Sequence, residues 1–188
     1  MEIETLKELK KIIKIEKKKY LNTENKHDYI LKIVKSNPDV KVWKFIKQMR
    51  KTSYLYHNRR KNVIYLLRYL INANIMNRIG RKIGIETGEN VFDIGIRIYH
   101  SQGIVINGNA RIGKNCRLYG NNCIGNNGLS NKCPVLGDDI KVCVGAKILG
   151  DIYLANNITV AAGAVVLKSC LEENAILGRN SCKNNWLQ

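Results

Sequence analysis

The chain lacks the features that define several protein classes. Among its 188 residues only two are proline, which excludes collagen-like and proline-rich sequences. Its most apolar run, Val63–Ile71, is interrupted by Arg68 and falls far short of the ~20 residues that a membrane-spanning helix needs. The first residues contain no continuous apolar segment of the signal-peptide type, so we expect a cytoplasmic protein.

Cysteine pairs of the metal-binding type are also missing. None of the six cysteines stands in a CxxC pair, and no cluster of histidines accompanies them. A zinc site is therefore not expected, and neither is a disulfide framework in a chain without an export signal. We expect reduced thiols, most of them buried, and no metal cofactor.

Acidic residues are scarce in the first part of the chain. Residues 1–82 contain 22 Lys and Arg against 7 Asp and Glu, whereas residues 83–188 contain 10 against 8. Two readings of this basic part stay open, a solvated surface and peripheral attraction to an anionic membrane. Motifs of the known nucleic-acid-binding modules are absent, so we expect no nucleic-acid partner.

Residues 1–82 show helical periodicity. Apolar residues recur at helical spacing among lysines over about 4–20, and a second helix is predicted over 28–35, where Asn37-Pro38 would end it. Trp43, Ile46 and Met49 continue the pattern beyond that point. A last helix is predicted over 63–81. One of its faces carries Leu66, Leu67, Leu70, Ile71 and Ile75.

From about Ile83 the sequence repeats every six residues. Ten positions at this spacing are all Ile, Leu or Val, although these types make up only 31 of the 106 residues from 83 to 188. Chance has a probability of roughly five in a million. The ten residues are Ile106, Ile112, Leu118, Ile124, Leu136, Val142, Ile148, Leu154, Val160 and Val166. This period predicts short strands joined by tight turns, stacked into a prism with an aliphatic interior.

The repeat is irregular at two places. Ser130 occupies an expected aliphatic position within residues 126–134, which we interpret as a loop that leaves the prism and returns in register. Upstream, the aliphatic row resumes at Ile98, so the rung Ile98–Val105 holds eight residues and includes His100. Function often resides where a regular repeat is interrupted. His100, the one histidine of the repeat half, is therefore our candidate catalytic residue.

Several motifs carry a family resemblance. Residues 145–150 (GAKILG) and 162–166 (AGAVV) resemble the left-handed β-helix acyltransferases, and residues 100–106 (HSQGIVI) are similar to their serine acetyltransferase branch. The resemblance implies an α+β protein with three parts. These are a basic α-helical domain over 1–82, a left-handed parallel β-helix acyltransferase domain over 83–178 and a C-terminal tail over 179–188.

By this resemblance the chain would transfer an acetyl group directly from acetyl-CoA to an acceptor hydroxyl, with His100 as the general base. Imidazole suits this role because it titrates near neutrality, and it can accept the hydroxyl proton and return it to the thiolate. A carboxylate commonly orients such a histidine. Glu86 is the candidate for that role, and Asp93 is the alternative.

The family also implies where acetyl-CoA binds. Its contacts come mostly from backbone along a groove between neighbouring prisms, and the matching residues here are Val144, Gly145 and Ala162. Lys168 would meet the phosphates, and Arg179 and Lys183 are the alternative phosphate contacts. Because two chains form the groove, the resemblance implies a homotrimer.

Two departures from the branch bear on the acceptor. Tyr99 stands where serine acetyltransferases have an aspartate, and residues 132–134 read Lys-Cys-Pro where they have Arg-His-Pro. Tyr99 and Lys132 are therefore the candidate substrate-binding residues. The pattern is most similar to the capsule and exopolysaccharide O-acetyltransferases, which favours a sugar hydroxyl as acceptor. Serine O-acetylation for cysteine biosynthesis and a non-catalytic β-helix that binds or assembles are the alternatives.

Overall fold

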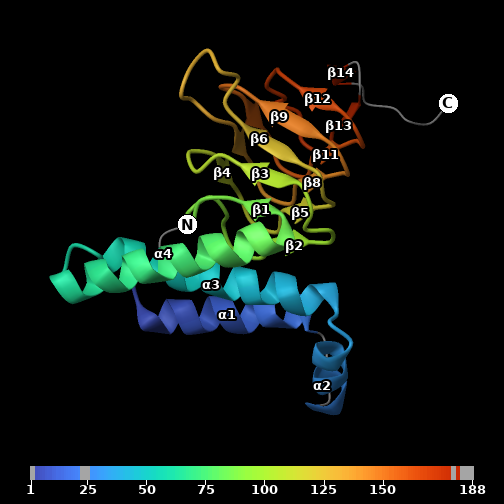
Figure 1. Cartoon of the computed structure of the whole chain (residues 1–188). Coiled ribbons are helices and arrows are strands. Elements are labelled where there is room, and N and C mark those ends of the chain that lie inside the picture. The colour runs from blue at the N-terminus through green and yellow to red at the C-terminus, as the bar shows by residue number, and fades with distance from the viewer. Residues whose placement is uncertain (1–2, 22–25, 179–180, 183–188) are drawn as a thin grey trace. The chain divides into compact units, whose positions relative to one another are not determined.

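The computed structural model describes residues 3–21, 26–178 and 181–182. Residue contacts divide the chain into two compact units, Met1–Ile83 and Gly84–Gln188. The first contains helices and the second contains short strands (Figure 1). In the described part of the chain, no helix is both long enough and apolar enough to cross a membrane.

The helical unit contains α1 (Leu6–Tyr20), α2 (Lys26–Val34), α3 (Pro38–Asn58) and α4 (Val63–Ile83). Helix α1 begins with a capping box, in which Thr5 and Glu8 each accept a hydrogen bond from the other's backbone N–H. Pro38 does more than end the preceding helix. It opens α3 directly after the N-cap Asn37, where the missing N–H of proline costs nothing.

An ion pair lies in the interior of this unit. The Arg50 guanidinium of α3 donates to both carboxylate oxygens of Glu16 in α1, at 3.0 and 2.7 Å, and both side chains are at most 1% exposed. The bidentate geometry offsets part of the cost of removing two charges from water. Apolar side chains complete the core, among them Tyr20, Trp43 and Phe45.

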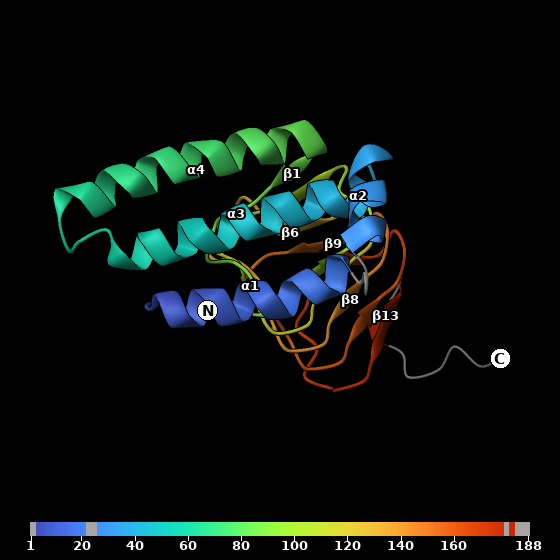
Figure 2. The same cartoon turned by 90° about the horizontal axis from the view of Figure 1, so that it is seen from below.

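Helix α4 meets α3 through polar and aromatic side chains. Gln48 donates to the Asn72 side-chain oxygen at 2.9 Å, and the rings of Tyr56 and Tyr69 lie 5.6 Å apart. Figure 2 shows α4, α3 and α1 side by side. The apolar face predicted for this helix exists, but it is turned toward solvent, because α3 contacts the opposite face of α4.

The second unit is a three-sided parallel β-helix. Its strands are β1 (Ile85–Glu86), β2 (Arg97–Ile98), β3 (Ile104–Ile106), β4 (Arg111–Ile112), β5 (Arg117–Leu118), β6 (Cys123–Gly125), β7 (Val135–Leu136), β8 (Lys141–Val142), β9 (Lys147–Leu149), β10 (Tyr153–Leu154), β11 (Thr159–Val160), β12 (Val165–Val166), β13 (Ile176–Gly178) and β14 (Ser181–Cys182). The three sheets have the orders β1-β3-β6-β9-β12, β4-β7-β10 and β2-β5-β8-β11-β13-β14. Pairing is parallel except between β13 and β14.

The register of the strands confirms the six-residue repeat. Val105 pairs with Cys123 and Lys147 with Val165, so one regular coil contains 18 residues, or three hexads. All ten aliphatic residues of the predicted row point inward and are at most 8% exposed. Cys123 pairs with Lys147, 24 residues later, which confirms a loop of six extra residues that returns in register.

Candidate functional site

The corner that carries His100 is larger than its counterparts. Ile98 pairs with Leu118, and Ile106 pairs with Ile124. Along the chain, Ile106 therefore follows Ile98 by eight residues, whereas in the next coil Ile124 follows Leu118 by six. This confirms the enlarged rung predicted from the sequence, and it leaves the strands on both sides in register.

Successive corners of this kind stack through backbone hydrogen bonds. Asn121 N donates to Gln102 O at 2.9 Å, Gly145 N to Gly120 O at 3.0 Å, and Gly163 N to Val144 O at 2.9 Å. We call residues 99–103, 119–122, 143–146 and 161–164 the His100 edge of the prism. The edge follows sheet β2-β5-β8-β11 and precedes sheet β3-β6-β9-β12 in each coil.

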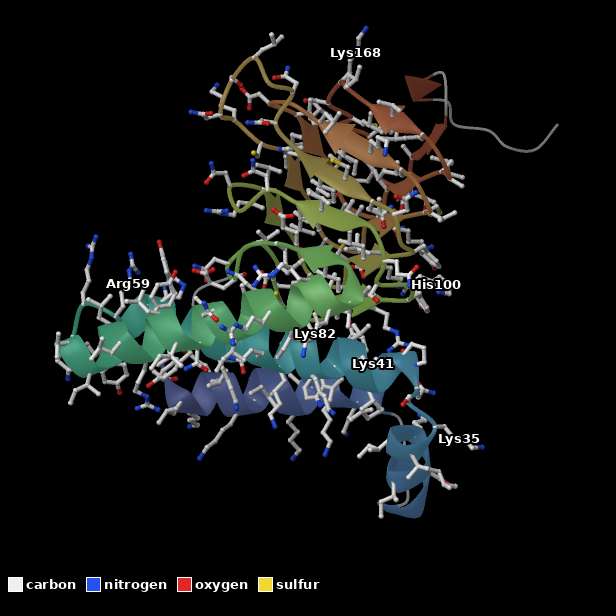
Figure 3. All side chains as sticks on the ribbon, in the orientation of Figure 1. Lys35, Lys41, Arg59, Lys82, His100 and Lys168 are labelled. Carbon is white, nitrogen blue, oxygen red and sulfur yellow. The ribbon has the colours of Figure 1, made fainter. Side chains whose placement is uncertain are left out.

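His100 is exposed on this edge, near the first coil (Figure 3). Its backbone lies directly against Gly120 of the following coil. A Cβ added to Gly120 would lie 2.9 Å from both the Cβ and the carbonyl oxygen of His100, and the φ of Gly120 is +107°. A side chain at position 120 would collide with His100 and would require a strained backbone conformation. Glycine at this position therefore lets the two coils pack closely at His100.

Asn122 fixes the turn that contains Gly120. Its side chain is fully buried, accepts from Gly120 N at 3.0 Å and donates to Cys143 O at 2.7 Å. Both polar groups are thus satisfied in a dry interior. Sequence reasoning missed this residue, although a signal existed. At the equivalent hexad positions the residues are apolar, namely Ala110, Cys116, Ile140, Ala146, Ile152, Ile158 and Ala164, so an asparagine there is the exception.

Tyr99 lies beside His100 and is stacked on the next coil. Its ring centroid lies 4.6 Å from that of Tyr119, with 14° between the planes, and the Arg97 guanidinium carbon lies 5.1 Å from the Tyr99 centroid. Burial raises the pKa of Tyr119, and the neighbouring Tyr99 adds to the effect. The Tyr99 residue is 38% exposed to solvent. The predicted substrate contact Tyr99 is therefore half of a stacked pair of tyrosine rings, directly beside His100 in the chain.

The predicted acetyl-CoA contacts Val144, Gly145 and Ala162 all lie on the His100 edge, in later coils. Val144 is 54% exposed and Ala162 is exposed as well. Among the described residues, no acceptor is found for the backbone N–H groups of Val144 and Ala162. The edge therefore offers backbone N–H donors that have no acceptor among the described residues, beside exposed apolar side chains. Such donors suit the amide and carbonyl oxygens of an extended ligand.

The two lysines assigned to ligand binding lie on another edge of the prism. Lys168 follows β12, and Lys132 belongs to the loop between β6 and β7, so both lie where sheet β3-β6-β9-β12 gives way to sheet β4-β7-β10. Figure 3 shows Lys168 and His100 toward opposite ends of the prism. They are three coils apart, or about 14 Å along the axis. One chain therefore does not bring Lys168 to His100.

Lys132 already has an ionic partner. Its Nζ lies 2.7 Å from Asp151 Oδ2, and the two side chains are 72% and 60% exposed. The hydrogen bond from Lys132 to Asp151 raises the pKa of the lysine. As an exposed pair it contributes little to stability. A carboxylate ligand would have to share or displace Asp151 to use this charge.

The two candidate carboxylates differ in position. Glu86 is exposed on β1, where it pairs with Val105 of the strand that follows the His100 corner. Asp93 precedes β2 at a different corner, and its carboxylate accepts from Ile94 N. Within the described residues, neither Glu86 nor His100 takes part in a side-chain hydrogen bond or ion pair. Glu86 as the orienting carboxylate stays a prediction.

The described residues contain no cluster of metal ligands. The free thiols include Cys123 and Cys143, which are half-buried, and Cys116, Cys133 and Cys170, which are buried. Burial raises the pKa of Cys116 to about 12, so this thiol is neutral and packs as a small apolar side chain. Arg179 and Lys183, also considered for phosphate contacts, lie outside the described residues.

Comparisons with known proteins place this geometry in context. No family model matches the chain. A serine acetyltransferase of Staphylococcus xylosus is 32% identical over 120 residues, which cover 61% of this chain and 55% of that protein. One of Synechococcus elongatus is 28% identical over 131 residues, covering 69% and 51%. Over these residues the chain is similar to serine acetyltransferases. It spans about half the length of these curated relatives.

Solved structures agree on the fold. A serine acetyltransferase of Neisseria gonorrhoeae superposes with a TM-score of 0.68 at 22% identity, covering 91% of this chain and 65% of that one. A serine acetyltransferase solved in complex with CoA gives a TM-score of 0.63 at 22% identity, covering 76% and 56%. The architecture is thus the predicted one, an N-terminal helical region followed by a left-handed β-helix.

Proposed function

We propose that the chain is an acetyl-CoA-dependent O-acetyltransferase in which His100 is the general base. The observation that carries this proposal is the His100 edge. It presents an exposed imidazole on an enlarged, glycine-supported corner, in line with the backbone donors of Val144 and Ala162. The similarity to serine acetyltransferases supports the same chemistry.

The proposed reaction is direct. The imidazole accepts the proton of the acceptor hydroxyl while that oxygen attacks the thioester carbon, and the tetrahedral intermediate collapses with cleavage of the C–S bond. The proton then passes from the imidazolium to the CoA thiolate, which leaves as the thiol. No acyl-enzyme is needed, so no serine or cysteine nucleophile is assigned. Backbone N–H groups of the edge are suited to stabilising the oxyanion.

A homotrimer would explain the separation of the ligand-binding residues. His100 and Lys168 lie on different edges of one prism, so a site that uses both requires edges from two copies. In this arrangement Val144, Gly145 and Ala162 line the acetyl-CoA groove, and Lys168 approaches the phosphates from across it. The neighbour solved with CoA supports a CoA thioester as donor.

L-Serine is the acceptor that the comparisons favour, because the relatives and the structural neighbours are named serine acetyltransferases. A sugar hydroxyl is the second candidate. It is favoured by the aromatic stack of Tyr99 on Tyr119 and by the pairing of Lys132 with Asp151. A free amino acid needs charged partners for its carboxylate and ammonium groups, whereas a sugar packs on aromatic rings and needs none.

The donor chemistry is tested by measuring CoA release from acetyl-CoA with His100→Ala, and with His57→Ala in the helical unit as the matched control. Loss of a general base should lower the rate by roughly 10²–10⁴-fold, with the control unchanged. Equal rates in both variants would remove His100 from the mechanism. A panel of L-serine and sugar acceptors then decides between the two acceptors.

The shared site is tested by complementation. Co-expressed His100→Ala and Lys168→Ala chains should form mixed trimers in which some grooves contain both native residues. Activity would then exceed that of either variant alone. If the mixture never exceeds the variants while the assembly is trimeric, the two residues do not act in one groove.

A further inference from the structure

The strongest feature outside the candidate site is the outer face of α4. Seven aliphatic side chains on this face are between 39% and 66% exposed, all within the first thirteen residues of the helix. They are Val63, Ile64, Leu66, Leu67, Leu70, Ile71 and Ile75. A water-soluble surface rarely gathers this many large apolar side chains, which indicates that something covers them.

The charge around this face is of one sign. Residues 40–85 contain twelve Lys and Arg and no Asp or Glu. Exposed basic side chains flank the apolar stretch at both ends, with Arg60 and Lys61 before it and Arg78, Arg81 and Lys82 after it. Figure 3 shows Arg59 and Lys82 toward the two ends of α4.

We propose that α4 binds an anionic lipid bilayer, lying in the plane of the interface with its apolar face inserted and its flanking cations at the headgroups. Two copies of the chain joined through this face would bring like charges together, with no acidic residue in the segment to offset them. The face is also broad, with Leu66 and Leu67, and then Leu70 and Ile71, adjacent in sequence, whereas a helix–helix seam is narrow. An anionic bilayer supplies both apolar depth and negative charge.

This binding is interfacial, because no described helix can cross a bilayer. It is also independent of the proposed acetyl transfer, since every α4 residue lies in the helical unit and His100 lies in the other.

The test is flotation of the full chain with vesicles of phosphatidylcholine, with and without phosphatidylglycerol, at low salt. Wild-type protein should float only with the anionic vesicles. The double variant Leu67→Gln with Ile71→Gln should bind at least about tenfold more weakly, and so should the triple variant Arg78→Gln, Arg81→Gln and Lys82→Gln. These exposed sites tolerate such changes with little loss of stability.

Matched controls separate insertion from plain charge attraction. Leu129→Gln with Leu171→Gln removes two exposed leucines from the β-helix unit, and Lys7→Gln, Lys10→Gln and Lys14→Gln removes three exposed charges from α1. Both controls should bind nearly as wild type does. If the α4 apolar variant floats like wild type, or if it instead lowers the molar mass measured by light scattering, the face binds something other than lipid and the proposal is wrong.

Discussion

The two units of this protein bury their interiors with different side chains. The β-helix contains a column of Ile, Leu and Val, and beside it lies the buried Asn122, held by two hydrogen bonds. The helical unit buries a bidentate Glu16–Arg50 pair and joins α3 to α4 through Gln48 and Asn72. One unit therefore depends on a repeated local pattern, and the other on specific pairs far apart in sequence.

This difference has a physical cause. Each coil of a β-helix packs only on its neighbours, so the same residue types serve in every coil and stability approaches a sum of similar increments. A small helical unit has no such repetition. Its charged pair is costly to break, because either partner alone would be left as an uncompensated charge in a dry interior.

The comparison predicts its largest effect at Glu16. Glu16→Ala leaves the Arg50 guanidinium buried without its carboxylate and should lower the free energy of unfolding of the helical unit by about 3–5 kcal/mol. Asp151→Ala breaks the pair with Lys132, which solvent screens, and should lower the free energy of unfolding far less than Glu16→Ala does. Urea unfolding followed by circular dichroism measures both. Similar losses of unfolding free energy in the two variants would show that burial does not set the cost of breaking these ion pairs.

A second effect concerns apolar side chains. Leu118 is fully buried in the β-helix, so Leu118→Ala should cost about 2–5 kcal/mol through lost contacts and a cavity. Leu67 is 54% exposed on α4, and Leu67→Ala should change stability by less than about 0.5 kcal/mol. The midpoint of thermal or urea unfolding in the absence of lipid is the measurement. A large loss at Leu67 would mean that α4 is covered in solution.

A third effect links packing to the site. Gly120→Ala places a methyl group against the backbone of His100 and should lower acetyl transfer by about 10²-fold, because small misplacements of a catalytic group are costly. Gly128→Ala, in the loop between β6 and β7, is the matched control. Gly128 also has a positive φ, +79°, but nothing lies within 4 Å of the added Cβ. Equal losses of activity would show that backbone strain, and not contact with His100, is responsible.

The smallest effect is that of alkaline pH on Cys116. An unfolded thiol loses its proton near pH 9, whereas the folded one keeps it to about 12, so the unfolded state binds fewer protons in between. The contribution of Cys116 to the free energy of unfolding should therefore fall as pH rises from about 9. Cys116→Ala should flatten that dependence. An unchanged slope in the variant would assign it to other groups.

The enlarged rung and the site could be predicted only in part. Counting hexads located His100 and the loop at 126–134, because an irregularity is visible against a regular period. The residues that position the His100 corner, Gly120 and Asn122, could not be found by counting hexads. Gly120 and Asn122 act on a neighbour twenty or more positions away, and that neighbour is known only when the coil register is known. Lys132 was assigned to ligand binding from its place in the Lys-Cys-Pro triplet. Its ion pair with Asp151, in the following coil, became visible only in the structure.

The sequence by itself determined the two-part organisation, the aliphatic interior of the prism and the corner where chemistry is expected. It could do so because a β-helix converts a local period directly into burial, one residue per rung. Tertiary structure alone decided which face of α4 is exposed, that Glu16 meets Arg50, and that His100 and Lys168 lie on different edges. Those outcomes depend on contacts between segments that are far apart in the sequence. Local sequence patterns do not distinguish among the possible contacting residues, and only the folded chain brings particular ones together.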